Sequence, residues 1–185
     1  MIVTITPNTA IDLIVTIPKF TPESTIRSTH TLYSMGGKPT DASWILGRMG
    51  VSSRALGLSA GAIGVKVNTM LNAFGVLTDF VEAEGETRIN TVILDEASGE
   101  QTTITTASMT VNETHLDQLR AKTYDVMANA TVIIIGGSLP KGVPSSFYSD
   151  VIRLAHEYNV PVIFDASEPH LKVGLQAKPT FIKPN

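Results

Sequence analysis

An apolar run that leads directly into a glycine-rich turn constrains this chain more than any other feature. Residues 131–135 read Thr-Val-Ile-Ile-Ile, and residues 136–144 follow as Gly-Gly-Ser-Leu-Pro-Lys-Gly-Val-Pro. A short, continuous apolar run of this kind is typical of a parallel strand that is buried on both faces. Open α/β sheets bind ligands where their strands end. The turn is therefore predicted to be a binding loop, in which Ser138 offers a hydroxyl group.

The rest of the chain alternates between strand and helix patterns. The strands are predicted at residues 2–5, 54–58, 131–135, 161–164 and 180–182. The helices are predicted at residues 40–50, 63–74, 110–127 and 147–158. Thr40 is the expected N-cap of the first helix, and Thr110 with Glu113 forms an expected capping box for the third. This alternation predicts an α/β fold with a mostly parallel sheet.

Two segments break the alternation and predict a separate small sheet. Residues 12–17 read as a β-branched strand that ends at Pro18. Residues 78–106 contain three strand-like runs, and a turn at residues 96–99 makes the last two a hairpin. Threonines alternate there with apolar residues, which indicates a sheet with one solvated face. We interpret these segments as a lid on the α/β core.

Composition limits the classes of protein to consider. The chain has 185 residues, of which 43% are hydrophobic and 17% charged, so one main domain is expected. A formal net charge of -3 gives no basic field for nucleic acid or for an anionic membrane surface. The chain has no cysteine, which excludes disulfides and thiolate metal sites and fits the cytoplasm. We expect no export signal and no membrane anchor.

Five motifs together resemble the ribokinase-like (PfkB) carbohydrate kinases, and most closely the phosphofructokinase and tagatose-phosphate kinase branch. They are Thr6-Pro-Asn-Thr-Ala-Ile-Asp12, Gly36-Gly-Lys38, Thr87-Arg-Ile-Asn90, Ser138-Leu-Pro-Lys-Gly-Val-Pro144 and Ile182-Lys-Pro-Asn185. The resemblance implies a three-layer α/β/α core with a small β-sheet lid. It implies lid insertions at about residues 11–35 and 79–106 of a single domain, 1–185, that is incomplete at its C-terminal side.

The resemblance also implies which residues hold the acceptor, a sugar or a sugar phosphate. These residues are Asp12, Arg27, Gly36, Gly37, Lys38, Asp41, Arg88, Asn90 and Ser138. An ionised aspartate accepts hydrogen bonds from sugar hydroxyls, and guanidinium groups suit a substrate phosphate. Taken singly, the same residues have plainer interpretations: a turn or cap for Asp12 and Ser138, a tight turn for the glycines, and solvated surface positions for Lys38 and the arginines.

The nucleotide side of the implied site is carried by Asp165, Lys183 and Asn185, with ATP and Mg²⁺ as cofactors. In the family this asparagine opens an Asn-x-x-Glu motif associated with magnesium, and the glutamate would lie beyond Asn185. The catalytic base and the glycine-rich anion site are expected there too. We therefore predict no catalytic residue and no metal site in this chain, and no phosphoryl transfer by it alone. Asp165 is equally well explained as a helix cap at the end of a strand.

Two positions depart from the family pattern. Pro39 stands where glycine is usual, and Asp41 stands where asparagine is usual. An anion at this position repels a sugar phosphate at close range, so Asp41 bears on the choice of acceptor. The four histidines show no metal spacing, and Glu82, Glu84 and Glu86 are interpreted as a solvated face.

Two other functions are compatible with parts of the pattern. A non-catalytic sugar- or nucleotide-binding protein of the same fold would explain Pro39 and Asp41. A nucleotide-dependent oxidoreductase is disfavoured, because the first strand leads to no Gly-x-Gly-x-x-Gly. A homodimer formed through the lid is expected as well, since an exposed apolar sheet face needs a partner.

Overall fold

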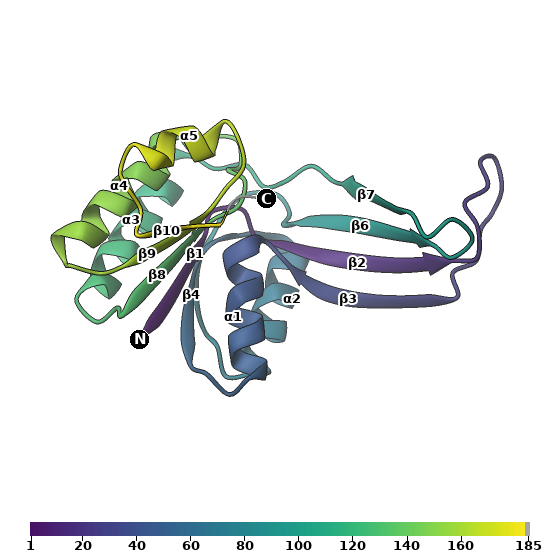
Figure 1. Ribbon diagram of the computed structural model, residues 1–185, viewed down its shortest axis with the longest axis horizontal. Coiled ribbons are helices and arrows are strands. Elements are labelled where there is room, and N and C mark those ends of the chain that lie inside the picture. The colour runs from purple at the N-terminus through teal and green to yellow at the C-terminus, as the bar shows by residue number, and fades with distance from the viewer. Residues whose placement is uncertain (184–185) are drawn as a thin grey trace.

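A computed structural model describes residues 1–183 and shows a layered core from which a second sheet projects (Figure 1). The main sheet is six-stranded and parallel throughout. Its strands in spatial order are β10 (Phe181–Ile182), β9 (Val162–Asp165), β8 (Val132–Gly136), β1 (Ile2–Thr6), β4 (Ser53–Ser59) and β5 (Leu77–Glu82). The predicted α/β class and the predicted buried strand at 131–135 are confirmed.

Helices cover the two faces of this sheet. One face carries α1 (Lys38–Arg48) and α2 (Gly61–Asn72), and the other carries α3 (Glu113–Met127), α4 (Ser146–Glu157) and α5 (His170–Leu175) (Figure 1). The larger buried cluster fills the space on the α3 and α4 side, where Tyr148, Phe164 and Ile135 are almost fully buried. None of the helices within residues 1–183 has the length and apolar character that a bilayer span requires.

The lid is a four-stranded sheet of mixed direction. Its strands in spatial order are β3 (His30–Gly36), β2 (Ala10–Ile17), β6 (Arg88–Asp95) and β7 (Gln101–Thr105). The expected hairpin is present, because β6 and β7 pair antiparallel. Strand β3 was not predicted; it reads as a mixture of polar and apolar residues and pairs with β2 in register from Ala10 with Gly36 onwards.

The second lid segment is shorter than the predicted 79–106. Residues 77–82 form β5, which pairs parallel with β4 and closes one edge of the main sheet. Val81 is buried in the large cluster and Phe80 packs against the smaller one. This apolar pair therefore belongs to the core, and the lid resumes only at Arg88.

The base of the lid is tied to the core by a second buried cluster. Ile11 of β2 and Met35 of β3 pack with Val67 and Leu71 of α2, and all four are at most 2% exposed. The apolar face of α2 therefore serves both sheets. The distal part of the lid has no such support, because β7 is exposed along its whole length.

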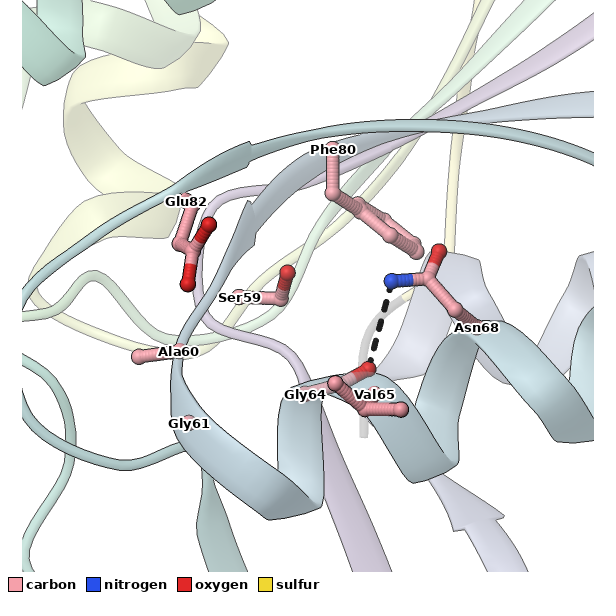
Figure 2. A pocket seen from close by; sticks show the side chains of 8 residues that line it. All are labelled: Ser59, Ala60, Gly61, Gly64, Val65, Asn68, Phe80 and Glu82. Carbon is pink, nitrogen blue, oxygen red and sulfur yellow. Dashed lines mark hydrogen bonds between the residues drawn. The ribbon is translucent and has the colours of Figure 1, made fainter.

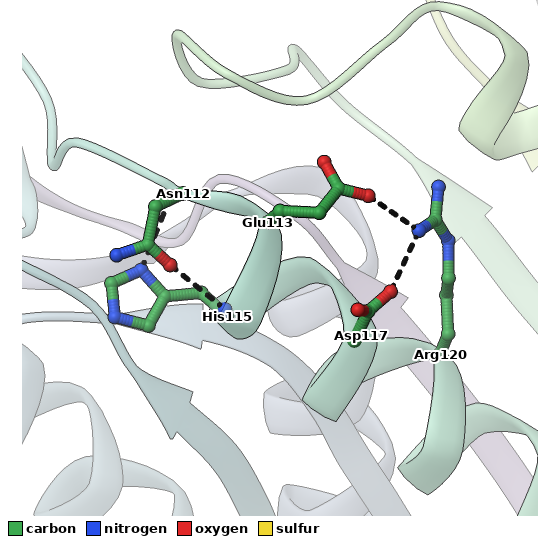
Figure 3. Close-up of polar contacts among 5 residues, drawn as sticks. All are labelled: Asn112, Glu113, His115, Asp117 and Arg120. Carbon is green, nitrogen blue, oxygen red and sulfur yellow. Dashed lines mark hydrogen bonds and ion pairs between the residues drawn. The ribbon is translucent and has the colours of Figure 1, made fainter.

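Two predicted helix starts were wrong for identifiable reasons. Thr40 is fully buried and its hydroxyl donates to Thr6 Oγ1 at 2.6 Å, so α1 starts earlier, with Gly37 as its N-cap. Thr110 instead exchanges backbone hydrogen bonds with Glu84. The N-cap of α3 is Asn112, whose side chain accepts from the His115 amide at 3.1 Å (Figure 3).

The first two turns of α3 carry a small polar network on the surface. His115 Nδ1 accepts from the Asn112 amide at 3.3 Å, which completes the capping box. Arg120 donates to Glu113 and to Asp117, each at 2.9 Å (Figure 3). These contacts give His115 a structural role at the helix start.

Candidate functional site

The site begins where the lid leaves the core, at the first residues of β2 and β6. The parallel register places Asp12 beside Asn90, on the same face of the lid. Asn90 Nδ2 donates to Asp12 Oδ1 at 2.7 Å. The pair is partly buried, so the carboxylate is oriented before any ligand binds. Its other lone pairs remain able to accept hydrogen bonds from hydroxyl groups.

Gly36 and Gly37 bring bare backbone against this carboxylate. A Cβ added to Gly36 would lie 2.5 Å from Asp12 Oδ1 and 3.0 Å from the Ala10 Cβ. Gly37 has a φ of 75°, a conformation that favours glycine, and it turns the chain from β3 into α1. The two glycines therefore set the close approach of α1 to the lid.

Arg88 opens β6 and lies next to the same carboxylate. Burial lowers the pKa of its guanidinium group, while the nearby Asp12 carboxylate opposes that shift. Within residues 1–183, Arg88 Nε is buried and has no hydrogen-bond partner. An always-charged fork with an unused donor is suited to an anionic group of a ligand. The structure thus brings the predicted residues Asp12, Arg88 and Asn90 together.

Asp41 faces this group from the first turn of α1. Burial raises the pKa of its carboxyl group, and repulsion from Asp12 raises it further. Within the described residues the Asp41 carboxylate makes no hydrogen bond and no ion pair. The charge of Asp41 is therefore unfavourable in the absence of a ligand.

A second group of charges lies at the carboxyl end of β9. Asp165 pairs with Lys38 of α1 and with Lys183, whose Nζ lies 3.2 Å from Asp165 Oδ2. These three residues line a cavity of about 350 Å³ together with Asp41 and apolar residues of α1, β8 and β9. Lys38 and Lys183 bring two ammonium groups together beside Asp165, so this part of the cavity is suited to a phosphate group.

The glycine-rich turn after β8 is held by a residue that sequence reasoning missed. Asn8 Nδ2 donates to Ser138 Oγ at 3.0 Å, and Ser108 Oγ donates to Asn8 Oδ1 at 2.6 Å. Asn8 is only 5% exposed. It therefore links the turn to the segment that returns from the lid. Its place in the Thr6–Asp12 motif was a signal, although the asparagine itself was not singled out.

The strand that carries Arg88 is anchored by two further residues that were missed. Thr87 Oγ1 accepts from the Ala60 amide at 2.8 Å, and Thr87 donates its own amide to the Ala60 carbonyl at 3.0 Å. Glu86 accepts from the amides of Ala62 and Ile63 at the start of α2. Glu86 is exposed, as predicted, but it also caps a helix.

Two predicted site residues stand apart from this cluster. Arg27 lies in the exposed loop of residues 18–29, which joins β2 to β3 at the far end of the lid (Figure 1). The structure does not bring Arg27 to Asp12, because β2 runs the length of the lid between them. Asn185 lies outside the described residues.

Comparison with known proteins places this geometry in a family. Residues 3–185 match the description "pfkB family carbohydrate kinase". The chain belongs to this family. The assignment agrees with the resemblance of the five motifs, and it covers both the core and the lid.

The curated relatives are sugar-phosphate kinases by name. The chain is 34% identical to D-tagatose-1-phosphate kinase of Bacillus licheniformis over 185 residues, which is 100% of this chain and 60% of that protein. It is 29% identical to 1-phosphofructokinase of Bacillus subtilis with the same two coverages. The chain therefore spans about 60% of the length of these relatives.

Solved structures agree with the fold over nearly the whole chain. A Thermotoga maritima protein titled "Possible 1-phosphofructokinase" superposes with a TM-score of 0.93 at 29% identity, covering 100% of this chain and 60% of that one. Escherichia coli phosphofructokinase-2 in complex with fructose-6-phosphate gives a TM-score of 0.85 at 28% identity, covering 95% of this chain and 58% of that one. The core and the projecting lid are thus shared with this family.

Proposed function

We propose that this protein takes part in ATP-dependent phosphorylation of a sugar or sugar phosphate at a hydroxyl group. The observation that carries the proposal is the Asp12–Asn90 pair with Arg88 beside it, all at the base of the lid. A fixed carboxylate suits the hydroxyl groups of a sugar, and a buried guanidinium with an unused donor suits a phosphate. Relatives named 1-phosphofructokinase and tagatose-phosphate kinase support the same chemistry.

The acceptor would be held from both sheets at once. In this proposal Asp12, Asn90 and Arg88 bind from the lid, while the remaining contacts come from the core. The core residues are Gly36, Gly37, Lys38, Asp41 and Ser138. The Asp41 carboxyl has no side-chain partner among the described residues, and it would repel a phosphate placed beside it. We therefore propose that Asp41 accepts a hydrogen bond from an uncharged hydroxyl of the sugar.

The phosphate donor would occupy the cavity beside Asp165. Lys38 and Lys183 supply positive charge there, and the cavity volume of about 350 Å³ leaves room for part of a nucleotide. Asn185 is proposed as a further contact from the same segment. No cluster of three His, Cys, Asp or Glu residues that could hold a metal occurs among residues 1–183. We propose that Mg²⁺ binds together with the phosphates of ATP.

The chemical step itself requires more than these binding groups. The family resemblance implies a catalytic base and an anion site beyond Asn185, and the chain spans 60% of the length of the relatives. We propose that the 185-residue chain binds its ligands without turning them over. Steady ADP release above background from the purified chain with MgATP and a sugar phosphate would contradict this.

We further propose a homodimer formed through the lid, and a cytoplasmic location. Tyr33 and Ile104 lie on one face of the lid and are 46% and 54% exposed, and Leu32 on the opposite face is 40% exposed. Exposed apolar side chains of this kind are candidates for contact with a second copy of the chain. The lack of cysteine fits a reducing compartment. Light scattering after size exclusion tests the assembly, and a monomer at micromolar concentration would contradict the dimer.

The acceptor assignment is tested by calorimetric binding of paired ligands. Fructose 1-phosphate, fructose 6-phosphate and the two tagatose phosphates are each compared with the unphosphorylated sugar. Arg88→Ala is expected to weaken binding of the phosphorylated sugar about 10- to 100-fold and to leave ATP binding nearly unchanged. Arg153→Ala, on the exposed face of α4, is the matched control. An equal loss of affinity for the sugar phosphate and for ATP in Arg88→Ala would overturn the assignment. If the full-length protein binds the sugar but does not phosphorylate it, a non-catalytic binding protein would be favoured.

A further inference from the structure

A smaller cavity lies at the carboxyl ends of β4 and β5, which are at the opposite end of the strand order from β9 and β10. It has a volume of about 170 Å³, and none of its lining residues belongs to the acceptor or nucleotide groups described above. Figure 2 shows the end of β4 and the first turns of α2 on one side and β5 on the other. The lining residues are Ser59, Ala60, Gly61, Gly64, Val65, Asn68, Phe80 and Glu82.

Three polar side chains face this cavity with unused hydrogen-bonding capacity. Ser59 is only 6% exposed, and within residues 1–183 its hydroxyl has no hydrogen-bond partner. Figure 2 shows this hydroxyl pointing into the space between Glu82 and Asn68. The Glu82 carboxylate has no ion pair in the same part of the chain. Asn68 donates to the Gly64 carbonyl at 3.3 Å, which leaves its amide oxygen as an acceptor.

The charges around the cavity exclude an anion as its natural occupant. The free amides at the start of α2 would attract one, but the Glu86 carboxylate already accepts from Ala62 and Ile63. Lys66, on the same helix, is directed away and lies over the ring of Tyr33 on the lid. The field at the cavity is therefore negative, with Glu82 and Glu86 as its sources.

We propose that this cavity binds a small ammonium compound, such as an amino alcohol. The ammonium group would pair with Glu82, and the oxygen atoms of Ser59 and Asn68 would accept its remaining hydrogens or those of a hydroxyl. The aromatic ring of Phe80 borders the same space and favours a cation. A cavity of about 150 Å³ holds a benzene-sized molecule, so a ligand of roughly four to six heavy atoms fits here.

The test uses ethanolamine hydrochloride as the probe and amide NMR of the full 185-residue chain as the readout. At constant ionic strength, ethanolamine is expected to cause saturable shifts at residues 59–68 and 80–83. Ethylene glycol, which has nearly the same size but no charge, is expected to cause none. Absence of saturable shifts with ethanolamine, or equal shifts with both compounds, would overturn the proposal.

Variants separate a built site from general attraction to acidic surface. Glu82→Gln is expected to lower the affinity for ethanolamine about tenfold or more, because it removes the charge and keeps the shape. Glu84→Gln removes an exposed carboxylate two residues away that does not line the cavity, and is expected to leave the affinity unchanged. Ser59→Ala is expected to weaken binding to a smaller extent. An equal loss of affinity for ethanolamine in Glu82→Gln and Glu84→Gln would mean that binding depends only on net surface charge, which would contradict the site.

Discussion

The main sheet and the lid are stabilised in different ways. Strands β1, β8 and β9 contribute residues such as Val3, Ile133 and Phe164 that are fully buried between helices. Strand β6 is only half-buried along its length, and β7 is exposed. The core is therefore stabilised by apolar burial, and the lid by backbone pairing and by its base. The polar site lies at the one place where both kinds of support meet.

The sharpest test of this contrast is loss of one leucine from each region. Leu56→Ala empties a fully buried position of β4 and is expected to lower the free energy of unfolding by about 2–5 kcal/mol. Leu32→Ala, on a lid strand where 40% of the side chain is exposed within one chain, is expected to cost less than about 1 kcal/mol at protein concentrations where the chain is monomeric. Urea unfolding measures both. A comparable loss in the two variants would show that the lid surface is covered in solution.

The link between the two regions is tested at Thr87. Thr87→Val keeps the shape of a side chain that is 1% exposed but leaves the Ala60 amide unpaired, which is expected to cost about 1–3 kcal/mol. Thr91→Val, four residues further along in β6, is the control and should be nearly neutral, because the Thr91 hydroxyl has no hydrogen bond within the described residues. Thermal unfolding gives the comparison. If Thr87→Val were as stable as wild type, the anchor of β6 would have to be sought elsewhere.

The position of the Asp12 carboxylate at the junction is tested by Gly36→Ala. The added methyl group would meet Asp12 Oδ1 and displace it from Asn90, so affinity for the sugar phosphate is expected to fall about tenfold or more. Asp12→Asn is expected to cause a similar loss. In the double variant the two losses should not add, since both act through one carboxylate. Full additivity in calorimetric titrations would separate Gly36 from Asp12.

The smallest expected effect concerns the unpaired carboxyl of Asp41. Its pKa is raised in the folded protein, so the stability it permits is greatest below its unfolded pKa of about 3.9 and is lost as the pH rises through the folded value. Asp41→Asn is therefore expected to stabilise the protein at pH 7, by less than about 1 kcal/mol, and to make no difference near pH 3. Unfolding curves across this pH range check the sign. A variant that is less stable at pH 7 would show that Asp41 has a favourable partner.

Much of the core could be predicted from the sequence, because the signals that define it are local. The run at residues 131–135 and the turn after it became β8 and the loop that carries Ser138. Asp165 ends β9 at the ligand edge, as the end of an apolar run indicated. The pairing of β6 with β7 followed from the turn between them. Apolar periodicity and turn residues depend on neighbours in sequence, so these elements needed no tertiary information.

The lid required more than its own sequence. Strand β3 has no clear alternation and is a strand because β2 offers it a partner. Residues 79–82 resemble the lid strands in composition, yet β4 takes them into the main sheet. Which sheet a strand joins depends on the open edges around it, and a local pattern does not record those edges.

The sequence by itself determined the α/β class, the strand and turn that form the ligand edge, and the motifs that mark the family. The tertiary structure decided which of the marked residues meet. It joined Asn8 to Ser138 and Ser108 across 130 and 100 residues of chain, set Asp12 against Asn90 across 78, and left Arg27 at the far end of the lid. The pattern of buried residues can be read from the local sequence. Contacts between distant segments depend on strand register and sheet direction, which are fixed only in the assembled fold.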